Sequence, residues 1–192
     1  MSFSNLRITG PDAARYELGK PMYVYDRNAH LGTLDPVRVS RDGTEVHISR
    51  FAATPFVKSA RRNFGPLVLV EVTSFLAEQF EAVQSVSFSL SREIETYGDG
   101  TKVATARSVL LEEIGASGVS ISPQPDSETP GNFVVQGMWT YSERNLAALQ
   151  QRLRQEREIY CDLERHARQV TAVLGLRGRL RRWWAGHRRP GR

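Results

Sequence analysis

The clearest alternation of apolar and polar residues runs from Ser85 to Ser91, where every second side chain is a serine. A period of two is typical of a strand with one buried face and one exposed face. A second strand is predicted at residues 133–139, with Phe133, Val135 and Trp139 on one face. We expect an antiparallel arrangement for the serine-rich strand.

The first part of the chain predicts short strands joined by turns. Strands are expected at residues 22–25, 37–39 and 46–48, and Asp42-Gly43 favours a hairpin between the last two. These segments together indicate a small β-meander.

Three segments in the middle of the chain are harder to interpret. The apolar run at residues 67–70 is compatible with a buried strand, and residues 75–83 have helical spacing. Residues 101–114 fit either a helix or a hairpin strand, and the β-branched residues at the start of this segment favour the strand.

The strongest predicted element is a long helix that begins at Ser142, a residue type favoured as an N-cap. Neither proline nor glycine interrupts the sequence before Gly175. A heptad counted from Leu146 has apolar residues at all but one position, Glu156, which is typical of a coiled-coil seam. The proposed oligomerisation residues are Leu146, Leu149, Leu153, Tyr160, Leu163 and Val170.

Such a helix would be about 48 Å long, more than a small domain can cover. We therefore expect it to pair with a second copy of the chain in a homo-oligomer. The alternative is a helix that lies across its own domain and overhangs it.

The 192 residues, of which 40% are hydrophobic, suffice for one compact domain. The predicted fold class is α+β, with a mostly antiparallel β body, as a small barrel or meander, before a long coiled-coil-like helix. Four regions are expected: a β-rich region (1–66), a barrel-like region with one helix (67–141), the heptad helix (142–174) and a basic tail (175–192).

The net charge of +5 is concentrated at the C-terminal end of the chain, where residues 177–192 contain seven arginines and no acidic residue. The rest of the chain is therefore slightly acidic. Arginine mixed with tryptophan suits an anionic membrane surface or a nucleic acid, although a solvated basic extension is also possible. The anion-binding candidates are Arg177, Arg179, Arg181, Arg182, Trp183 and Trp184.

Cysteine content and hydropathy bear on the location of the protein. The single cysteine, Cys161, allows no intramolecular disulfide, and the sequence has neither a signal-peptide pattern nor an 18-residue apolar run. We expect a cytoplasmic protein, with a possible peripheral position at the inner membrane.

The sequence contains no strong catalytic, metal or nucleotide motif. The four histidines lie at no known ligand spacing from one another or from Cys161, so we predict no metal site and no cofactor. No nucleophile has an evident base partner, so no catalytic residue is assigned and enzyme activity is not expected.

Residues 86–139 resemble the β-barrel of PilZ domains, regulatory modules that often bind cyclic di-GMP. A strand, the turn Gly98-Asp99-Gly100, a second strand and the sequence Glu113 to Ile121 carry this resemblance. It implies ligand-binding roles for Glu113, Gly115 and Gly118, although only Gly118 matches the family motif. Arg61 and Arg62 stand nearest to the family's arginine pair, without its spacing.

These observations favour a non-enzymatic cytoplasmic regulatory or adaptor protein. It would oligomerise through the heptad helix and bring its Arg/Trp tail to an anionic membrane surface or a protein partner. The alternatives are a nucleic-acid-binding protein and a degenerate PilZ-like module that responds to a cyclic dinucleotide.

Overall fold

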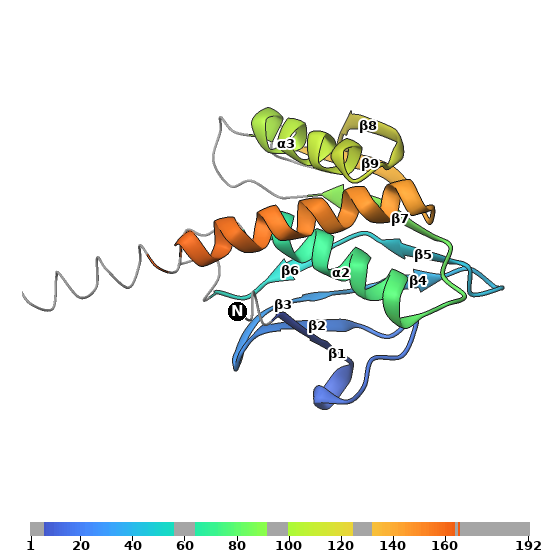
Figure 1. The fold of residues 1–192 in the computed structure, drawn as a ribbon, viewed down its shortest axis with the longest axis vertical. Helices are drawn as coiled ribbons and strands as arrows, with labels where there is room; N and C mark the ends of the chain where they lie inside the picture. The colour runs from blue at the N-terminus through green and yellow to red at the C-terminus, as the bar shows by residue number, and fades with distance from the viewer. Residues whose placement is uncertain (1–5, 56–63, 92–99, 125–131, 164, 166–192) are drawn as a thin grey trace, which may run out of the picture.

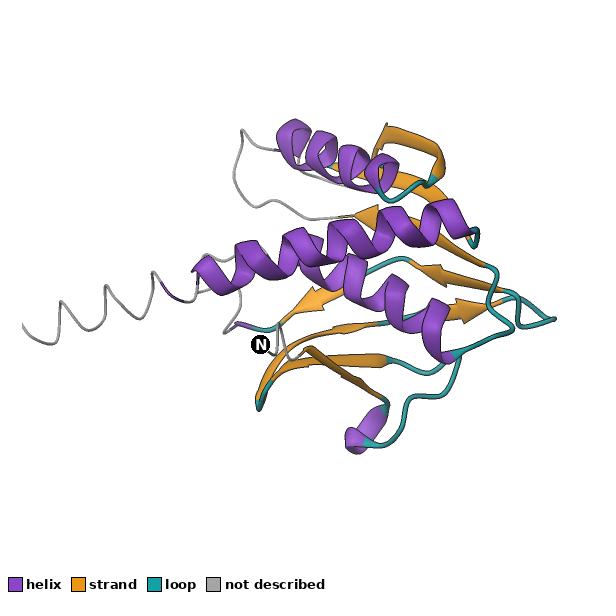
Figure 2. Ribbon diagram, viewed as in Figure 1, coloured by secondary structure: helices purple, strands orange, loops and turns teal. Residues whose placement is uncertain are grey.

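The computed structural model describes residues 6–55, 64–91, 100–124, 132–163 and 165. Within these residues the strands form two sheets, and helices pack on them (Figures 1 and 2). The strands are β1 Leu6–Thr9, β2 Met22–Asp26, β3 Ala29–Leu34, β4 Val37–Val39, β5 Glu45–Ile48, β6 Phe51–Ala53, β7 Ser85–Ser91, β8 Ser117–Pro123 and β9 Phe133–Thr140. The helices are the short η1 Pro11–Ala13, then α2 Gly65–Gln79, α3 Gly100–Glu113 and a helix over residues 143–163, here called the C-terminal helix.

The first sheet is antiparallel and has the strand order β1-β2-β3-β6. Its inner face contributes Met22, Val24 and Leu34 to the core, each at most 3% exposed. Gly32 on β3 is required by close packing, because an added Cβ would lie 2.5 Å from the carbonyl oxygen of Ala52.

The second sheet is mixed and has the order β4-β5-β7-β9-β8, with β5 and β7 parallel. The strand predicted at Ser85–Ser91 is confirmed as β7, with Val86 and Phe88 buried. It is antiparallel to β9, as expected, but parallel to β5. A parallel pair needs a crossover connection, and α2 lies in that crossover between β5 and β7.

The predicted hairpin between β4 and β5 is confirmed, and Gly43 in its turn has a φ of +77°. The Asp42 carboxylate accepts hydrogen bonds from the hydroxyls of Ser40 and Thr44, at 2.6 and 2.9 Å. These hydrogen bonds, from Ser40 above all, lower the pKa of Asp42 because they favour its charged form.

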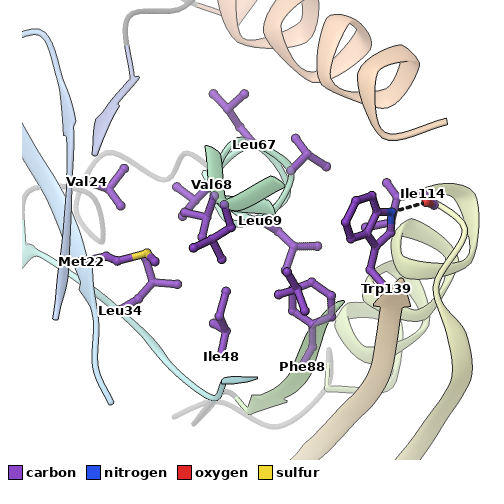
Figure 3. Close-up of a cluster of buried hydrophobic side chains, with 14 of the residues drawn as sticks. Met22, Val24, Leu34, Ile48, Leu67, Val68, Leu69, Phe88, Ile114 and Trp139 are labelled. Carbon is purple, nitrogen blue, oxygen red and sulfur yellow. Dashed lines mark hydrogen bonds between the residues drawn. The ribbon is translucent and has the colours of Figure 1, made fainter. Parts of the chain in front are cut away.

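The apolar run at residues 67–70 is the first full turn of α2, so the interpretation as a strand is wrong. All four of these side chains are buried, and burial continues without a break to Ser74. Figure 3 labels Leu67, Val68 and Leu69 on this helix. A helix surrounded by protein shows no amphipathic period, so its pattern cannot be told from that of a buried strand. Pro66 in the first turn fits the helix start.

Residues 101–114 also form a helix, α3, where the strand was favoured. The helix packs on β8 and β9, with Leu110, Leu111 and Ile114 buried. The indole N–H of Trp139 on β9 donates to the carbonyl oxygen of Ile114 at 3.0 Å (Figure 3). Tertiary packing therefore outweighs the β-branched residues at the start of this segment.

The predicted N-cap of the C-terminal helix is confirmed, because the Asn145 N–H donates to the Ser142 hydroxyl at 3.1 Å. The predicted seam, however, is covered by its own domain: Leu149, Leu153 and Tyr160 are at most 7% exposed. The helix lies across α2 (Figure 1), and Arg157 forms a bidentate ion pair with Glu71 of α2, at 2.7 and 2.8 Å.

The predicted fold class is therefore wrong. The described body is a mixed α/β arrangement of two open sheets with helices packed on them, and it is neither a barrel nor a meander. The C-terminal helix, as far as residue 163, is a packed part of this body and not a free coiled coil. No helix among the described residues has the length and hydropathy needed to cross a bilayer.

Candidate ligand cavity

The site begins where β5 and β7 stop pairing. The two strands run in register from Glu45/Ser85 to Ile48/Phe88. After Ile48 the chain leaves this sheet, and β6 joins β3 in the other sheet. β7 continues to Ser91 and pairs there with β9, so β5 and β7 are no longer paired beyond Ile48 and Phe88.

A hydrogen-bonded row ties β5 to β7 just before they separate. The Ser87 hydroxyl donates to the Glu45 carboxylate at 2.6 Å, and His47 Nδ1 lies 3.0 Å from the same hydroxyl oxygen. The Ser87 hydroxyl has a single hydrogen, and it donates this hydrogen to Glu45. The Ser87 oxygen therefore accepts from His47, and His47 Nδ1 is the donor in the second contact. Side chains alternate along a strand, so this row lies on the face opposite the buried Val46 and Ile48.

A cavity of about 390 Å³ lies where the strands separate, within the size range of small-molecule sites. Six side chains that are each at most 9% exposed form its inner wall: Leu34, Ile48, Val68, Leu69, Val72 and Leu110. In Figure 3, Ile48 and Leu34 extend from the strands toward the part of α2 that carries Val68 and Leu69. Crevices outside the carboxyl ends of parallel strands, where the chain changes direction between sheets, are common ligand sites.

The rim of the cavity is polar and positively charged. Gly65 and Pro66 bring the start of α2 to the rim, and the N-cap residue Phe64 makes no side-chain cap hydrogen bond. Lys102 and Arg107 of α3 also line the cavity, and the Arg107 guanidinium donates to the Leu90 carbonyl oxygen at 3.2 Å. Among the described lining residues these two carry the formal charges, and both are positive.

The arrangement suits a ligand with an apolar group and an anionic group. The inner wall offers apolar surface to the first, and the start of a helix with two cations suits the second. β7 adds a further feature, because residues 89–91 extend past β5 and pair only with β9 among the described strands. The other edge of this stretch can hydrogen-bond an amide-bearing ligand.

The three described residues implied by the PilZ resemblance lie outside this cavity. Gly115 has a φ of +86° and ends α3: its N–H donates to the Glu112 carbonyl oxygen, and the Ala116 N–H donates to that of Leu111. This pair of hydrogen bonds is a Schellman motif, so the positive φ of Gly115 is explained by its role in ending the helix. Glu113 pairs with Arg152 of the C-terminal helix at 2.9 Å, and Gly118 lies in β8 with a φ of +61°.

Several candidate residues cannot be compared with the structure. Arg61, Arg62, Val170 and the tail residues from Arg177 to Trp184 lie outside the described residues. Of the oligomerisation candidates, Leu149, Leu153 and Tyr160 pack in their own domain, Leu146 is half-buried and Leu163 is 48% exposed. Oligomerisation stays a prediction.

Sequence reasoning missed the lining residues of the cavity. Lys102 and Arg107, for example, lie in the segment 101–114, for which the sequence favours a strand. The site could be found only from the parallel pairing of β5 with β7. No local sequence pattern reveals that pairing.

No protein-family model matches the sequence, and no curated protein matches it significantly. Solved structures with similar folds share little sequence with it. Mutant forms of the spermidine/spermine N-acetyltransferase SpeG from Vibrio cholerae match 65% of this chain and 68% of their own, at 11% identity and a TM-score of 0.40. A protein of unknown function, AQ1966 from Aquifex aeolicus VF5, matches 84% of this chain and 83% of its own, at 14% identity and a TM-score of 0.42.

A further match is described as an acetyltransferase of the GNAT family, from Desulfovibrio desulfuricans. It covers 63% of this chain and 67% of its own, at 11% identity and a TM-score of 0.37.

These findings correct the sequence-based view of the function. The PilZ resemblance is wrong, because among residues 86–139 the described ones form α3 and part of an open sheet, and not a barrel. The expectation of a non-enzymatic regulatory or adaptor protein is corrected with it, because it depended on a PilZ-like barrel and a free coiled coil that the described residues do not form. The cavity, with its apolar wall and charged rim, has the size and lining typical of small-molecule sites.

Proposed function

We propose that this chain is an acyltransferase that takes its acyl group from a phosphate-bearing thioester such as an acyl-coenzyme A. The observation that carries the proposal is the cavity between β5 and β7, with its apolar inner wall and cationic rim. Acetyl transfer is the activity named for two of the matched structures. The cavity supports the proposal that this chain also transfers acyl groups.

The parts of such a thioester correspond to the parts of the cavity. The acyl group would occupy the space between α2, α3 and Ile48, out of contact with water. The phosphates would lie at the rim, close to the start of α2 and to Lys102 and Arg107. The carrier's amides could pair with the open edge of residues 89–91 of β7.

The reaction is an acyl transfer to an incoming nucleophile such as an amine. The amine nitrogen bonds to the thioester carbonyl carbon, the carbon–sulfur bond breaks, and the thiol leaves with the proton that the amine loses. The contribution of this chain is to bind the thioester, hold its carbonyl near the separated strand ends and exclude water from the acyl group.

Two measurements test the proposal. Isothermal titration calorimetry should detect acyl-coenzyme A binding to the full chain, and release of free thiol should follow when a panel of primary amines is added. If neither any thioester binds nor any thiol is released, the proposal is wrong.

A charge-reversal pair sharpens this test. Lys102→Glu places a negative charge at the rim and should weaken thioester binding by about tenfold, more at low salt than at high salt. Lys20→Glu makes the same change at an exposed position away from the cavity and should leave the affinity unchanged. Equal effects of the two variants would contradict a phosphate site at this rim.

The location and assembly of the protein belong to the same proposal. We place the activity in the cytoplasm, and we propose a peripheral position at a membrane and a homo-oligomeric state for testing by fractionation and light scattering.

A further inference from the structure

We propose that the cavity selects acyl groups of medium length, from hexanoyl to decanoyl, over acetyl; this rests on the acyl-transfer function proposed above. The inference comes from the depth, volume and lining of the cavity.

The depth follows from the two helices that form its walls. On α2 the lining begins at Gly65, which is exposed at the rim, and ends at the fully buried Val72. On α3 it begins at the exposed Lys102 and ends at Leu110, which is 3% exposed. Each helix therefore lines the cavity from an exposed residue to a buried one, and at 1.5 Å per residue the lined stretch is about 10 Å long.

The volume of the cavity agrees with this length. A cavity of about 390 Å³ holds roughly a dozen groups of the size of a water molecule. An acetyl group would fill only a small part of this space. The remainder is lined by leucine, isoleucine and valine side chains, which offer water no hydrogen bonds.

The chemistry of the wall also changes along the cavity in the direction that an acyl chain requires. Ser49, Ser91 and Arg107 lie among the lining residues at intermediate exposure, whereas Val68 and Val72 are at most 2% exposed. The polar groups thus belong to the outer part, where the thioester and phosphates would lie. The inner part offers only apolar surface, so each methylene group of an acyl chain that enters it is removed from contact with water.

The experiment is a chain-length series. Affinities of coenzyme A and of acetyl-, butyryl-, hexanoyl-, octanoyl- and decanoyl-coenzyme A are measured by calorimetry, together with free octanoate. Each methylene that becomes buried should tighten binding by about three- to fourfold. Octanoyl-coenzyme A should therefore bind at least about a hundredfold more tightly than acetyl-coenzyme A, and kcat/KM should follow the same order.

Two tryptophan substitutions on α3 test the position of the acyl chain. Ala106 is exposed on its helix yet lines the cavity, so Ala106→Trp should narrow the cavity midway without disturbing the fold. We expect this variant to lose the preference for octanoyl-coenzyme A over acetyl-coenzyme A by tenfold or more. Its neighbour Thr105 is exposed and does not line the cavity, so Thr105→Trp is the matched control and should behave as the unmodified chain.

The outcomes separate this inference from the proposed function. Binding of all thioesters with no gain along the series would overturn the chain-length inference and leave acyl transfer intact. Binding of octanoate but of no thioester would overturn the proposed function and support an apolar-chain site. Binding of none of these ligands would overturn both, and equal effects of the two tryptophan variants would place the acyl group elsewhere.

Discussion

The helix α2 and the C-terminal helix pack against each other, yet they are buried in opposite ways. Eight consecutive residues of α2, from Leu67 to Ser74, are buried, so this helix has protein on every side. The C-terminal helix is buried only along the line of Leu149, Leu153 and Tyr160, while Ile159 and Leu163 are about half exposed. The periodic spacing of apolar residues in a helix arises because one face is exposed, so a helix without an exposed face gives no periodic signal.

The same difference assigns the two helices different roles. α2 supplies one wall of the cavity, and its residues from Leu67 to Ser74 are covered by the rest of the domain. The C-terminal helix covers α2 from outside and holds it through the ion pair between Glu71 and Arg157. We expect substitutions to separate these roles.

The largest effect should come from the buried line of the C-terminal helix. Leu149→Ala removes a fully buried side chain and should lower the free energy of unfolding by about 3 kcal/mol. Ile159→Ala, on the half-exposed side of the same helix, is the control and should change it by less than about 0.5 kcal/mol. Urea denaturation of the two variants measures both values, and similar losses would show that the helix is not buried on one side only.

An intermediate effect is expected where the two helices are joined. Arg157→Ala leaves the Glu71 carboxylate, whose side chain is 9% exposed, without its bidentate partner. Because Arg157 itself is 31% exposed, we expect a loss of about 2 kcal/mol, less than for a fully buried pair. The double variant Glu71→Leu with Arg157→Leu leaves no unpaired charge and should recover most of the lost free energy of unfolding. If the stability does not recover, the loss in Arg157→Ala is not caused by the unpaired Glu71 carboxylate.

The smallest effect is expected at the start of the C-terminal helix. Ser142→Ala removes the hydroxyl that accepts from the Asn145 N–H and should cost about 1 kcal/mol. Ser142→Asp keeps an acceptor at this position and should retain the stability of the unmodified chain. Thermal unfolding of the three proteins is sufficient, and a loss in the Asp variant would contradict the capping role.

The sequence allowed the elements with one exposed face to be predicted. The strands at Ser85–Ser91 and Phe133–Thr140 alternate because solvent reaches one side of each, and Ser142 marks a helix start through a local hydrogen bond. The hairpin at Asp42-Gly43 was likewise predictable from local turn chemistry.

The elements that depend on distant partners were not predictable in this way. The sequence is compatible with a strand at residues 67–70 of α2 and favours a strand in α3. Both segments are helical because of packing in the domain, which for α3 is against β8 and β9, and not because of local preference. The cavity depends on the parallel pairing of Glu45–Ile48 with Ser85–Phe88, about 40 residues further along the chain. The six residues of its inner wall come from four separate elements, and no spacing in the sequence connects them.

The hydrogen bond between Tyr160 and Asp26 has a consequence for synthesis on the ribosome. It joins residues 134 positions apart, and the ion pair between Glu71 and Arg157 spans 86. A growing chain that has emerged only as far as β9 therefore has α2 uncovered, with its outer apolar side chains exposed to water. The domain is completed only when residues 143–163 have left the exit tunnel, and until then α2 is open to aggregation and proteolysis.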